Sequence, residues 1–424
     1  MTAGVWQSDL KQWFEQRSTA LGFDLAGIAA ADEPNSAAEA RDAARFEAWV
    51  DAGRAGDMEY LKRRDEEGRL LRSAVQVAHP WANSVAICAM SYGKPEPLSI
   101  DQAPSTSGWI ARYAWSGQPL DPESPTPQLR PTDYHDFLLT RLRQLAHELG
   151  ERAGGESKCY VDTGPLVERS LAARAGIGWI GKNTCVLNQG KGSWLLLGVI
   201  LSSLRLPAEM TVLAADRCGS CTRCIDACPT EALIAPHQMD ASRCIAYLTI
   251  EKKGSIAAEL RESMGRQVFG CDICQDVCPW NQRSSNGRSN AGAASPIQTR
   301  DELINPELDW LASMDAGTFR QWFKGSPIER TRRARLHRNV AIAMGNSGEQ
   351  RFLAQLQAWC AEPDLVLAEA ASWAIDKLQA NEGSSAAQSA GTVLVDEGAA
   401  LDGYAPPVRQ RVRSEVSPAL PTLR

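Results

Sequence analysis

The stretch CGSCTRCIDACP, from Cys218 to Pro229, decides how the rest of the chain is read. Its cysteines have the spacing C-x2-C-x2-C-x3-C-P, the ligand run of paired iron–sulfur clusters, in which the fourth thiolate binds the other cluster. A second set of ligands is therefore expected. CDICQDVCP, from Cys271 to Pro279, provides three cysteines, and Cys244 provides the fourth. Crossing the fourth cysteines predicts one 4Fe-4S cluster on Cys218, Cys221, Cys224 and Cys278, and a second on Cys228, Cys244, Cys271 and Cys274.

Other uses of these cysteines fit the pattern less well. Two structural zinc sites would also need eight thiolates, but a C-x2-C-x2-C triplet suits tetrahedral zinc poorly. Ligand-like spacing in a reducing compartment indicates metal rather than disulfides. The four cysteines outside the two sets are expected to be buried apolar side chains: Cys88, Cys159, Cys185 and Cys360.

Length and composition restrict the class of protein. A chain of 424 residues with 44% hydrophobic residues is expected to form two or three domains. The apolar run WLLLGVIL, from Trp194 to Leu201, is far shorter than the roughly 20 residues that cross a bilayer. The N-terminus has no cationic head followed by an apolar segment, which predicts a cytoplasmic protein. A net charge of −6 excludes a protein that is basic throughout, but it does not exclude a local cationic patch for nucleic acid.

Hydrophobic patterning predicts the main elements. LGFDLAGIAA is expected to lead from a helix into a strand, and SVAICAMS, residues 84–91, to form a second strand. The proline-rich segment 116–132 is predicted to be an exposed loop. Leucines at 138, 142, 145 and 149 predict a helix that stops at Gly150. Strand-like and glycine-rich pieces alternate between residues 159 and 201, and the chain beyond residue 379 lacks periodicity.

Nothing in the sequence is a strong nucleotide-binding motif. Gly176, Gly178 and Gly181 form an apparent GxGxxG, but no acidic residue follows at the required place, and a P-loop is absent. A longer order of segments is more specific: YVDTGPLVERSLAARAGIGWIGKNT, the eight cysteines, CIAYLTIE and FGCDICQDVCPWN. Over roughly residues 8–375 this order resembles the epoxyqueuosine reductases.

The resemblance implies an oxidoreductase with two 4Fe-4S clusters and cobalamin. It implies reduction of epoxyqueuosine to queuosine at the wobble position of tRNA, the last step of queuosine biosynthesis, with electrons from an unidentified donor. The D-x-H-x-x-G pattern of His-ligated cobalamin fails here, since Asp133-Tyr-His135 continues to Leu138, and the family binds the corrinoid without a histidine ligand. The alternatives are a corrinoid-dependent enzyme resembling reductive dehalogenases and a non-catalytic iron–sulfur electron-transfer subunit.

Asp162 matches the family's proton-donor position, at the end of the strand-like CYVD. An epoxide oxygen leaves readily only when it is protonated, so a positioned acid is needed. A carboxyl group near an apolar corrin face is expected to have a raised pKa, which keeps a proton available. The alternative role for Asp162 is to cap the following helix.

Other polar side chains are candidates for binding the corrinoid. Arg169 lies about two helical turns after Asp162 and could face the same pocket. Arg63 in MEYLKRR matches another family position, and Lys182 and Asn183 offer donors beside glycines. Each could equally be a solvated surface residue. Tyr134 and His135 could contribute to the substrate pocket.

The C-terminal part carries a cluster of arginines. Arg330, Arg332, Arg333, Arg335 and Arg338 lie within nine residues, in helical segments that resemble HEAT-like repeats. Phosphate is a natural counter-charge for them, so they are the predicted docking site for tRNA, with an acidic protein partner as the alternative.

Together these features predict an α+β multidomain enzyme with three segments and a tail. Residues 1–205 form the α/β cobalamin-binding and catalytic portion, and 206–285 the ferredoxin-like double-cluster insert. Residues 300–378 form the HEAT-like tRNA-binding region, and 379–424 a disordered tail. The chain is expected to be a monomer without membrane contact.

Overall fold

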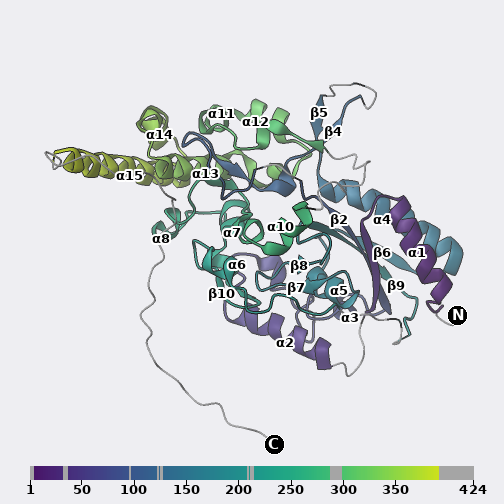
Figure 1. Cartoon of the computed structure of the whole chain (residues 1–424). Coiled ribbons are helices and arrows are strands. Elements are labelled where there is room, and N and C mark those ends of the chain that lie inside the picture. The colour runs from purple at the N-terminus through teal and green to yellow at the C-terminus, as the bar shows by residue number, and fades with distance from the viewer. Residues whose placement is uncertain are drawn as a thin grey trace, which may run out of the picture. The chain divides into compact units, whose positions relative to one another are not determined.

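The computed structural model describes residues 4–31, 37–94, 97–121, 124, 128–207, 210, 214–286 and 298–390 (Figure 1). Residues up to Asn381 belong to one compact unit. In this described part of the chain, no helix is both long enough and apolar enough to span a bilayer. Most of the predicted tail lies outside the described residues.

A four-stranded antiparallel sheet with the order β1-β2-β9-β6 forms the centre of the N-terminal part. Its strands are β1 (Leu25–Ala30), β2 (Ser84–Ser91), β6 (Ser157–Tyr160) and β9 (Leu195–Ser202). The middle strands β2 and β9 are almost continuously apolar, as expected of strands that are covered on both faces. α1 (Ser8–Ala20) and α4 (Tyr134–Ala153) cover one face, and α5 (Glu168–Arg174) covers the other.

Two predicted boundaries in this region are wrong. Gly150 does not stop its helix, because α4 continues to Ala153 and ends at Gly154, whose φ is 68°. The segment 116–132 is not simply a loop, because β4 (Ser116–Pro119) pairs with β5 (Leu129–Pro131) as an antiparallel hairpin, which β13 (Gln298–Thr299) extends. The described prolines lie at the ends of short strands, where an N–H donor is not required.

The GxGxxG glycines serve a hairpin rather than a nucleotide. β7 (Trp179–Ile180) pairs with β8 (Val186–Leu187), and a Cβ atom at Gly178 would lie 2.0 Å from the carbonyl oxygen of Leu187. Only glycine permits so close an approach of two backbones.

The cysteine region consists of short elements joined by turns. Its helices are α6 (Arg223–Asp226), α7 (Ile245–Ile250), α8 (Ala258–Arg261), α9 (Ile273–Asp276) and α10 (Pro279–Asn286). β10 (Leu233–Ala235) and β11 (Gln238–Met239) form a hairpin, and β12 (Gln267–Phe269) pairs in parallel with β3 (Trp109–Ile110). This last pairing joins the cysteine region to the N-terminal part. α2 (Ala37–Asp51) and α3 (Val75–Ala78) complete the helices before β2.

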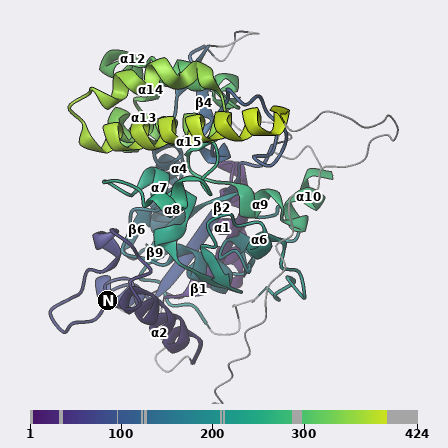
Figure 2. The same cartoon turned by 90° about the vertical axis from the view of Figure 1, so that its left-hand side faces the viewer.

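Five further helices follow: α11 (Leu308–Ala312), α12 (Ala316–Phe323), α13 (Arg332–Ser347), α14 (Leu353–Cys360) and α15 (Leu365–Ala390). Figure 2 shows α13, α14 and α15 side by side. A Cβ at Gly345 would lie 2.8 Å from the Cα of Ala374, so glycine lets α13 approach α15 closely. The expectation that disorder begins at residue 379 is wrong for 379–390, where the helix continues.

One hydrophobic core joins segments that the sequence predicted as separate domains. Trp109 and Trp115 from the N-terminal part, Leu248 from the cysteine region and Val340 from α13 belong to the same buried cluster. The three segments therefore depend on one another for burial of their apolar side chains.

Two of the predicted tRNA-binding arginines hold this core together instead. Arg338 is 1% exposed and donates to the carbonyl oxygens of Leu248, Lys252 and Gly254. Arg335 donates to the carbonyl oxygen of Ile250. These carbonyls lie at the end of α7, where a helix has no internal donors for its last oxygens. The prediction that both side chains meet phosphate is wrong, because their guanidinium groups are already used to cap α7.

Candidate functional site

Asp162 lies just beyond the end of β6 in a strained backbone conformation. Its φ is 55°, which costs a residue other than glycine on the order of 1 kcal/mol or more. Its backbone N–H donates to Glu168 Oε1 at 2.8 Å, and Glu168 is the first residue of α5. The helix is preceded by Val167 at the capping position, so Asp162 does not cap it. The capping alternative for Asp162 is therefore wrong, and its carboxylate is left free for other partners.

Those partners come from the start of α4. The Tyr134 hydroxyl donates to Asp162 Oδ2 at 3.5 Å, and His135 Nε2 lies 3.8 Å from the same oxygen. Asp162 has 69% of its side chain exposed, whereas His135 has 11% exposed. The carboxylate of Asp162 is thus open to solvent on one side and contacted by α4 on the other. Figure 1 shows α4 beside β6.

A second carboxylate and an arginine hold His135 from its other side. Asp133 Oδ1 lies 2.7 Å from His135 Nδ1, and Asp133 also caps α4 by accepting from the His135 N–H. Arg330 donates to Asp133 Oδ2 at 2.6 Å, and its Nη2 lies 2.7 Å from His135 Nδ1. Nδ1 can donate to Asp133 or accept from Arg330, but a single ring nitrogen cannot do both at once. Arg330 is therefore a site residue, which corrects its prediction as a free phosphate contact.

The charges around Asp162 determine where protons reside in the chain without ligands. Burial opposes ionisation of Asp162, but the hydrogen bond and charge of His135, with Arg169 and Arg330, lower its pKa. Burial also opposes the charge on His135, yet Asp133 and Asp162 raise the pKa of this imidazole. Burial and then the negative charge of Asp162 raise the pKa of Glu168 to about 8. The expected raised pKa is found at Glu168 and His135 rather than at Asp162.

Arg169 interacts electrostatically both with this carboxylate and with the second set of cysteines. Its Nη1 donates to the carbonyl oxygen of Thr184 at 3.1 Å. Burial disfavours its charge, while Cys185, Asp162, Cys274 and Cys244 are close enough to raise its pKa. Arg169 is therefore near Asp162, as its sequence position suggested, and the same side chain is near the second set of thiols.

Arg72 and Tyr60 border the site on another side. The Arg72 guanidinium lies 5.5 Å from the centre of the Tyr60 ring and donates to the carbonyl oxygen of Leu166 at 2.8 Å. Its Nε is buried and has no hydrogen-bond partner among the described residues. Arg63 is exposed, and its role in binding a corrinoid stays a prediction.

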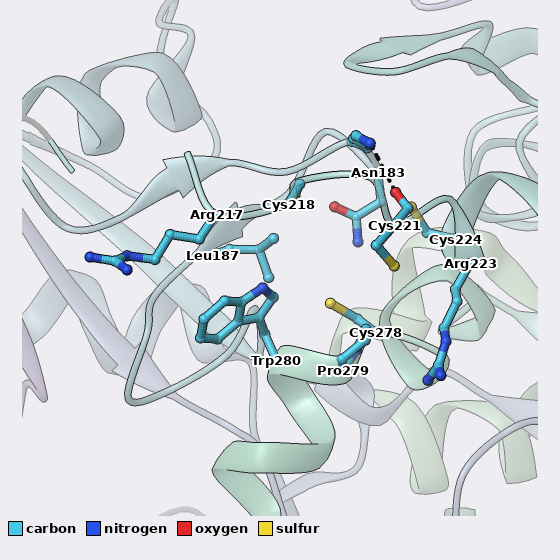
Figure 3. Close-up of a pocket in the computed structure, with 11 residues that line it drawn as sticks. Asn183, Leu187, Arg217, Cys218, Cys221, Arg223, Cys224, Cys278, Pro279 and Trp280 are labelled. Carbon is cyan, nitrogen blue, oxygen red and sulfur yellow. Dashed lines mark hydrogen bonds between the residues drawn. The ribbon is translucent and has the colours of Figure 1, made fainter. Parts of the chain in front are cut away.

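The first predicted set of cysteines lines one cavity of about 210 Å³ (Figure 3). Cys278 lies in this wall with Cys218, Cys221 and Cys224, although α6, β10–β11, α7 and β12 intervene in the sequence. Burial and then the charges of Cys278, Cys218 and Cys221 raise the pKa of the Cys224 thiol to about 11. Four thiols around one cavity form a donor set that fits a 4Fe-4S cluster.

The cysteines of the second predicted set also influence one another's pKa values, which indicates that they lie close together. Burial, followed by the charges of Cys244 and then Cys228, raises the pKa of Cys271 well above its ordinary value. The pKa of Cys274 is raised by a hydrogen bond with Cys185, by burial, and by the charges of Cys185, Cys271 and Cys244. Cys228, Cys244, Cys271 and Cys274 therefore also form a donor set that fits a cluster.

Two residues predicted to bind the corrinoid contact the cysteine loops. Lys182 Nζ donates to the carbonyl oxygens of Gly219 at 2.6 Å and Cys221 at 3.0 Å. Asn183 is buried and its amide donates to the carbonyl oxygen of Cys274 at 3.2 Å. The hairpin β7–β8 thus holds both cysteine loops in place, and corrinoid contacts of these two residues stay predictions.

The remaining cysteines differ from one another. Cys88 is buried as expected, but Cys360 is exposed, which contradicts its prediction as a buried side chain. Cys159 and Cys185 are partly buried. Cys360 therefore provides a surface thiol outside both sets.

Sequence reasoning missed Glu168, Asp133 and Arg330 as neighbours of Asp162. The sequence did carry a signal for Glu168. A second acidic residue six positions after a predicted proton donor can lie close to it, and two neighbouring carboxyl groups disfavour each other's ionisation. Arg330 carried none, since 195 residues separate it from His135.

Comparisons with known proteins agree with this arrangement. Residues 217–281 match a 4Fe-4S double cluster binding domain, and residues 72–163 match the family described as epoxyqueuosine reductase QueG, DUF1730. The epoxyqueuosine reductase of Xanthomonas campestris is 35% identical over 338 residues, covering 79% of this chain and 88% of that protein. That of Gloeobacter violaceus is 36% identical over 343 residues, covering 79% and 96%.

Solved structures extend the similarity to the fold. A crystal structure of epoxyqueuosine reductase with an epoxyqueuosine-modified stem loop of tRNA-Tyr superposes with a TM-score of 0.73 at 28% identity, covering 90% of this chain and 94% of that one. A Bacillus subtilis epoxyqueuosine reductase whose catalytic aspartate loop is swung out of the active site gives 0.72 at 27% identity, with coverage of 90% and 94%. On these similarities and the geometry above, the chain belongs to the epoxyqueuosine reductase family and contains a double 4Fe-4S cluster domain.

Proposed function

We propose that this chain reduces epoxyqueuosine to queuosine at the wobble position of tRNA. The observation that carries this proposal is an exposed carboxylate, Asp162, that shares an electrostatic neighbour, Arg169, with Cys244 and Cys274 of the second set of thiols. Members of the same family act on the epoxyqueuosine nucleoside, and one was crystallised with a modified tRNA stem loop. Acting on tRNA agrees with the expected cytoplasmic location.

The reaction consumes two electrons and two protons. Both C–O bonds of the epoxide break, a C=C bond forms between the two carbons, and the oxygen leaves as water. The thiols of the two sets would hold the clusters through which single electrons pass. When bound, cobalamin supplies a cobalt centre that collects single electrons and delivers two of them to the substrate.

The space around Asp162 has groups suited to a large polar cofactor. Arg72 offers a buried Nε without a described protein partner, and it lies beside Tyr60 at the edge of the site. With Arg169 and the predicted Arg63, these side chains would hold amide or phosphate groups of the corrinoid. The residues present thus fit the cofactor that the family resemblance implies.

Protons are supplied by the chain. Asp162 would pass a proton to the departing oxygen, because its carboxylate is more exposed than those of Asp133 and Glu168. Because the pKa of Asp162 is lowered, that proton must reach it from a neighbouring acid. Glu168, whose pKa is raised to about 8, holds a proton at neutral pH and accepts from the Asp162 backbone N–H. The pKa of His135 is also raised, and its Nε2 lies 3.8 Å from Asp162 Oδ2. Tyr134 orients the carboxylate by donating to Oδ2.

Turnover of tRNA that contains epoxyqueuosine tests this function. Anaerobically purified chain with cobalamin and a strong reductant should convert the nucleoside to queuosine, measured by mass spectrometry of the digested tRNA. A preparation with about eight irons, the content of two four-iron clusters, that binds no cobalamin and converts no tRNA would favour the electron-transfer subunit. Conversion of organic halides alone would favour the dehalogenase.

The helices α11 to α15 form the part that we propose as a HEAT-like tRNA-binding region. Of the five predicted arginines, Arg332 is exposed and Arg333 is partly exposed, at the beginning of the 16-residue helix α13. The start of a long helix carries unpaired N–H groups and a positive dipole end, which favour phosphate. The domain boundaries and the monomeric state stay predictions.

The variant Arg332→Gln/Arg333→Gln should bind the modified tRNA more weakly and with a flatter salt dependence. Each lost phosphate contact makes the negative slope of log K against log salt shallower by roughly 0.9 for a duplex and by less for a loop. Binding would be measured by filter retention at several salt concentrations. Arg143→Gln/Arg205→Gln, at two other exposed arginines, is the control. An unchanged affinity and slope would remove α13 from the tRNA interface.

A further inference from the structure

The mouth of the cysteine-lined cavity carries positive charge and no acid. Its lining residues include Lys182, Arg217 and Arg223 but neither Asp nor Glu. This is unusual in a chain with 51 acidic and 45 basic residues. Figure 3 shows Arg217 and Arg223 on opposite sides of the cavity, with Cys278 between them.

The two arginines are available to a partner, unlike the lysine. Both are exposed, and the described residues provide no hydrogen-bond or ion-pair acceptor for either guanidinium. Lys182 is used internally by the carbonyl oxygens of Gly219 and Cys221. Free guanidinium groups that flank an opening attract anionic surfaces and bind carboxylates in a bidentate manner.

The nearest carboxylates of the same loop are engaged. Asp216 accepts from the Cys218 N–H at 2.8 Å and lies 3.6 Å from His237 Nε2. Asp226 accepts from the Thr222 hydroxyl at 2.7 Å. They lower the local positive charge, but neither lines the cavity or pairs with Arg217 or Arg223.

The position of this cavity suits the entry of electrons. Arg169 donates to the carbonyl oxygen of Thr184 at 3.1 Å, and the amide of the adjacent Asn183 donates to the carbonyl oxygen of Cys274 at 3.2 Å, so the second set of thiols lies on the side of Arg169. The first set lines a cavity bordered by exposed side chains, with the partly buried ring of Trp280 in its wall. A donor that docks at Arg217 and Arg223 would meet the outer cluster, and the inner cluster would pass electrons to the site.

We propose that Arg217 and Arg223 form the docking surface for a one-electron carrier protein whose redox group is surrounded by acidic side chains. The inference rests on the proposed function, in that the cysteines of this cavity hold a cluster. A small patch with two cations and an aromatic ring matches the limited area of transient electron-transfer complexes. Complementary charges raise the association rate, and salt weakens that effect.

The test compares two reductants on the cluster-loaded enzyme. Reduced flavodoxin, an acidic carrier, should reduce Arg217→Glu/Arg223→Glu at least about tenfold more slowly than the unchanged chain at low salt, with a flatter salt dependence. Reduced methyl viologen, a small cation that does not depend on a positively charged docking surface, should reduce the variant at least as fast as the unchanged chain. Calorimetry should show that oxidised flavodoxin binds the Arg217→Glu/Arg223→Glu variant more weakly than the unchanged chain. This measurement does not depend on turnover.

Matched variants separate the possible outcomes. Arg143→Glu/Arg205→Glu changes the net charge equally at two exposed arginines that do not line the cavity and should leave the flavodoxin rate within about twofold, because steering depends on local charge. Equal flavodoxin rates and binding in the unchanged chain and the Arg217/Arg223 variant would overturn the proposal. Loss of tRNA affinity in that variant would assign the arginines to RNA and also overturn it. Failure of the unchanged chain to turn over with methyl viologen would count against the proposed function instead.

Discussion

Replacing Asp162 with Asn should lower turnover of epoxyqueuosine-containing tRNA by roughly a hundredfold or more. Asn keeps the shape of the side chain and can still accept from Tyr134, but it has no carboxylic proton to give to the departing oxygen. Single-turnover rates at saturating tRNA would isolate the chemical step. Iron content and cobalamin absorbance should be unchanged, since Asp162 contacts neither set of cysteines through a hydrogen bond in the described structure.

The pH profile provides a control for this assignment. Glu168 has a pKa of about 8, so it is protonated at neutral pH and loses its proton as the pH rises. Turnover of the unchanged chain should therefore fall as the pH rises through about 8. The residual turnover of Asp162→Asn should not follow this decline. Near-normal turnover in Asp162→Asn, with the decline intact, would move the acid role to Glu168 or His135.

The bounds of β2 and the place of Cys278 beside the first set of cysteines were predictable because their signals are local. SVAICAMS forms β2 with the predicted bounds, since an unbroken apolar run flanked by polar residues suits a strand covered on both faces. The crossing of the cysteines followed from a short spacing rule, and Cys278 does line the cavity of the first set. Such features depend on neighbours in sequence or on a fixed ligand geometry.

The arginines show why other features could not be predicted in the same way. Charge density alone suggested a phosphate-binding cluster, yet α13 is buried over most of its length and places Arg338 against the end of α7. The following run NVAIAM carried the available signal, because a helix that is apolar on every side is buried, and its charged residues then need internal partners. The meeting of Arg330 with His135 depends on packing between distant segments, which no local pattern encodes.

Replacing Cys278 with Ala should destroy the cluster of the cavity and leave the other cluster in place. Cys278 is separated from Cys224 by much of the cysteine region, yet it shares a cavity with Cys218, Cys221 and Cys224. A cluster with three protein thiolates is labile, so the iron content should fall from about eight towards about four. Turnover with reduced flavodoxin should then become undetectable, because the outer cluster is the proposed entry point for electrons.

Spectra of other cysteine variants decide whether the crossing is right. Electron paramagnetic resonance of Cys278→Ala should reproduce the spectrum of Cys224→Ala, in which the signal of the first cluster is lost. Cys244→Ala should instead lose the signal of the second cluster. Cys360→Ala, which removes an exposed thiol, should retain both signals and full turnover. If Cys278→Ala matched Cys244→Ala instead, each run of cysteines would serve its own cluster, and the shared cavity would not reflect ligation. The crossed arrangement ties Cys278, next to α10, to the loop before α6, so its confirmation would also explain why the two halves of the cysteine region fold against each other.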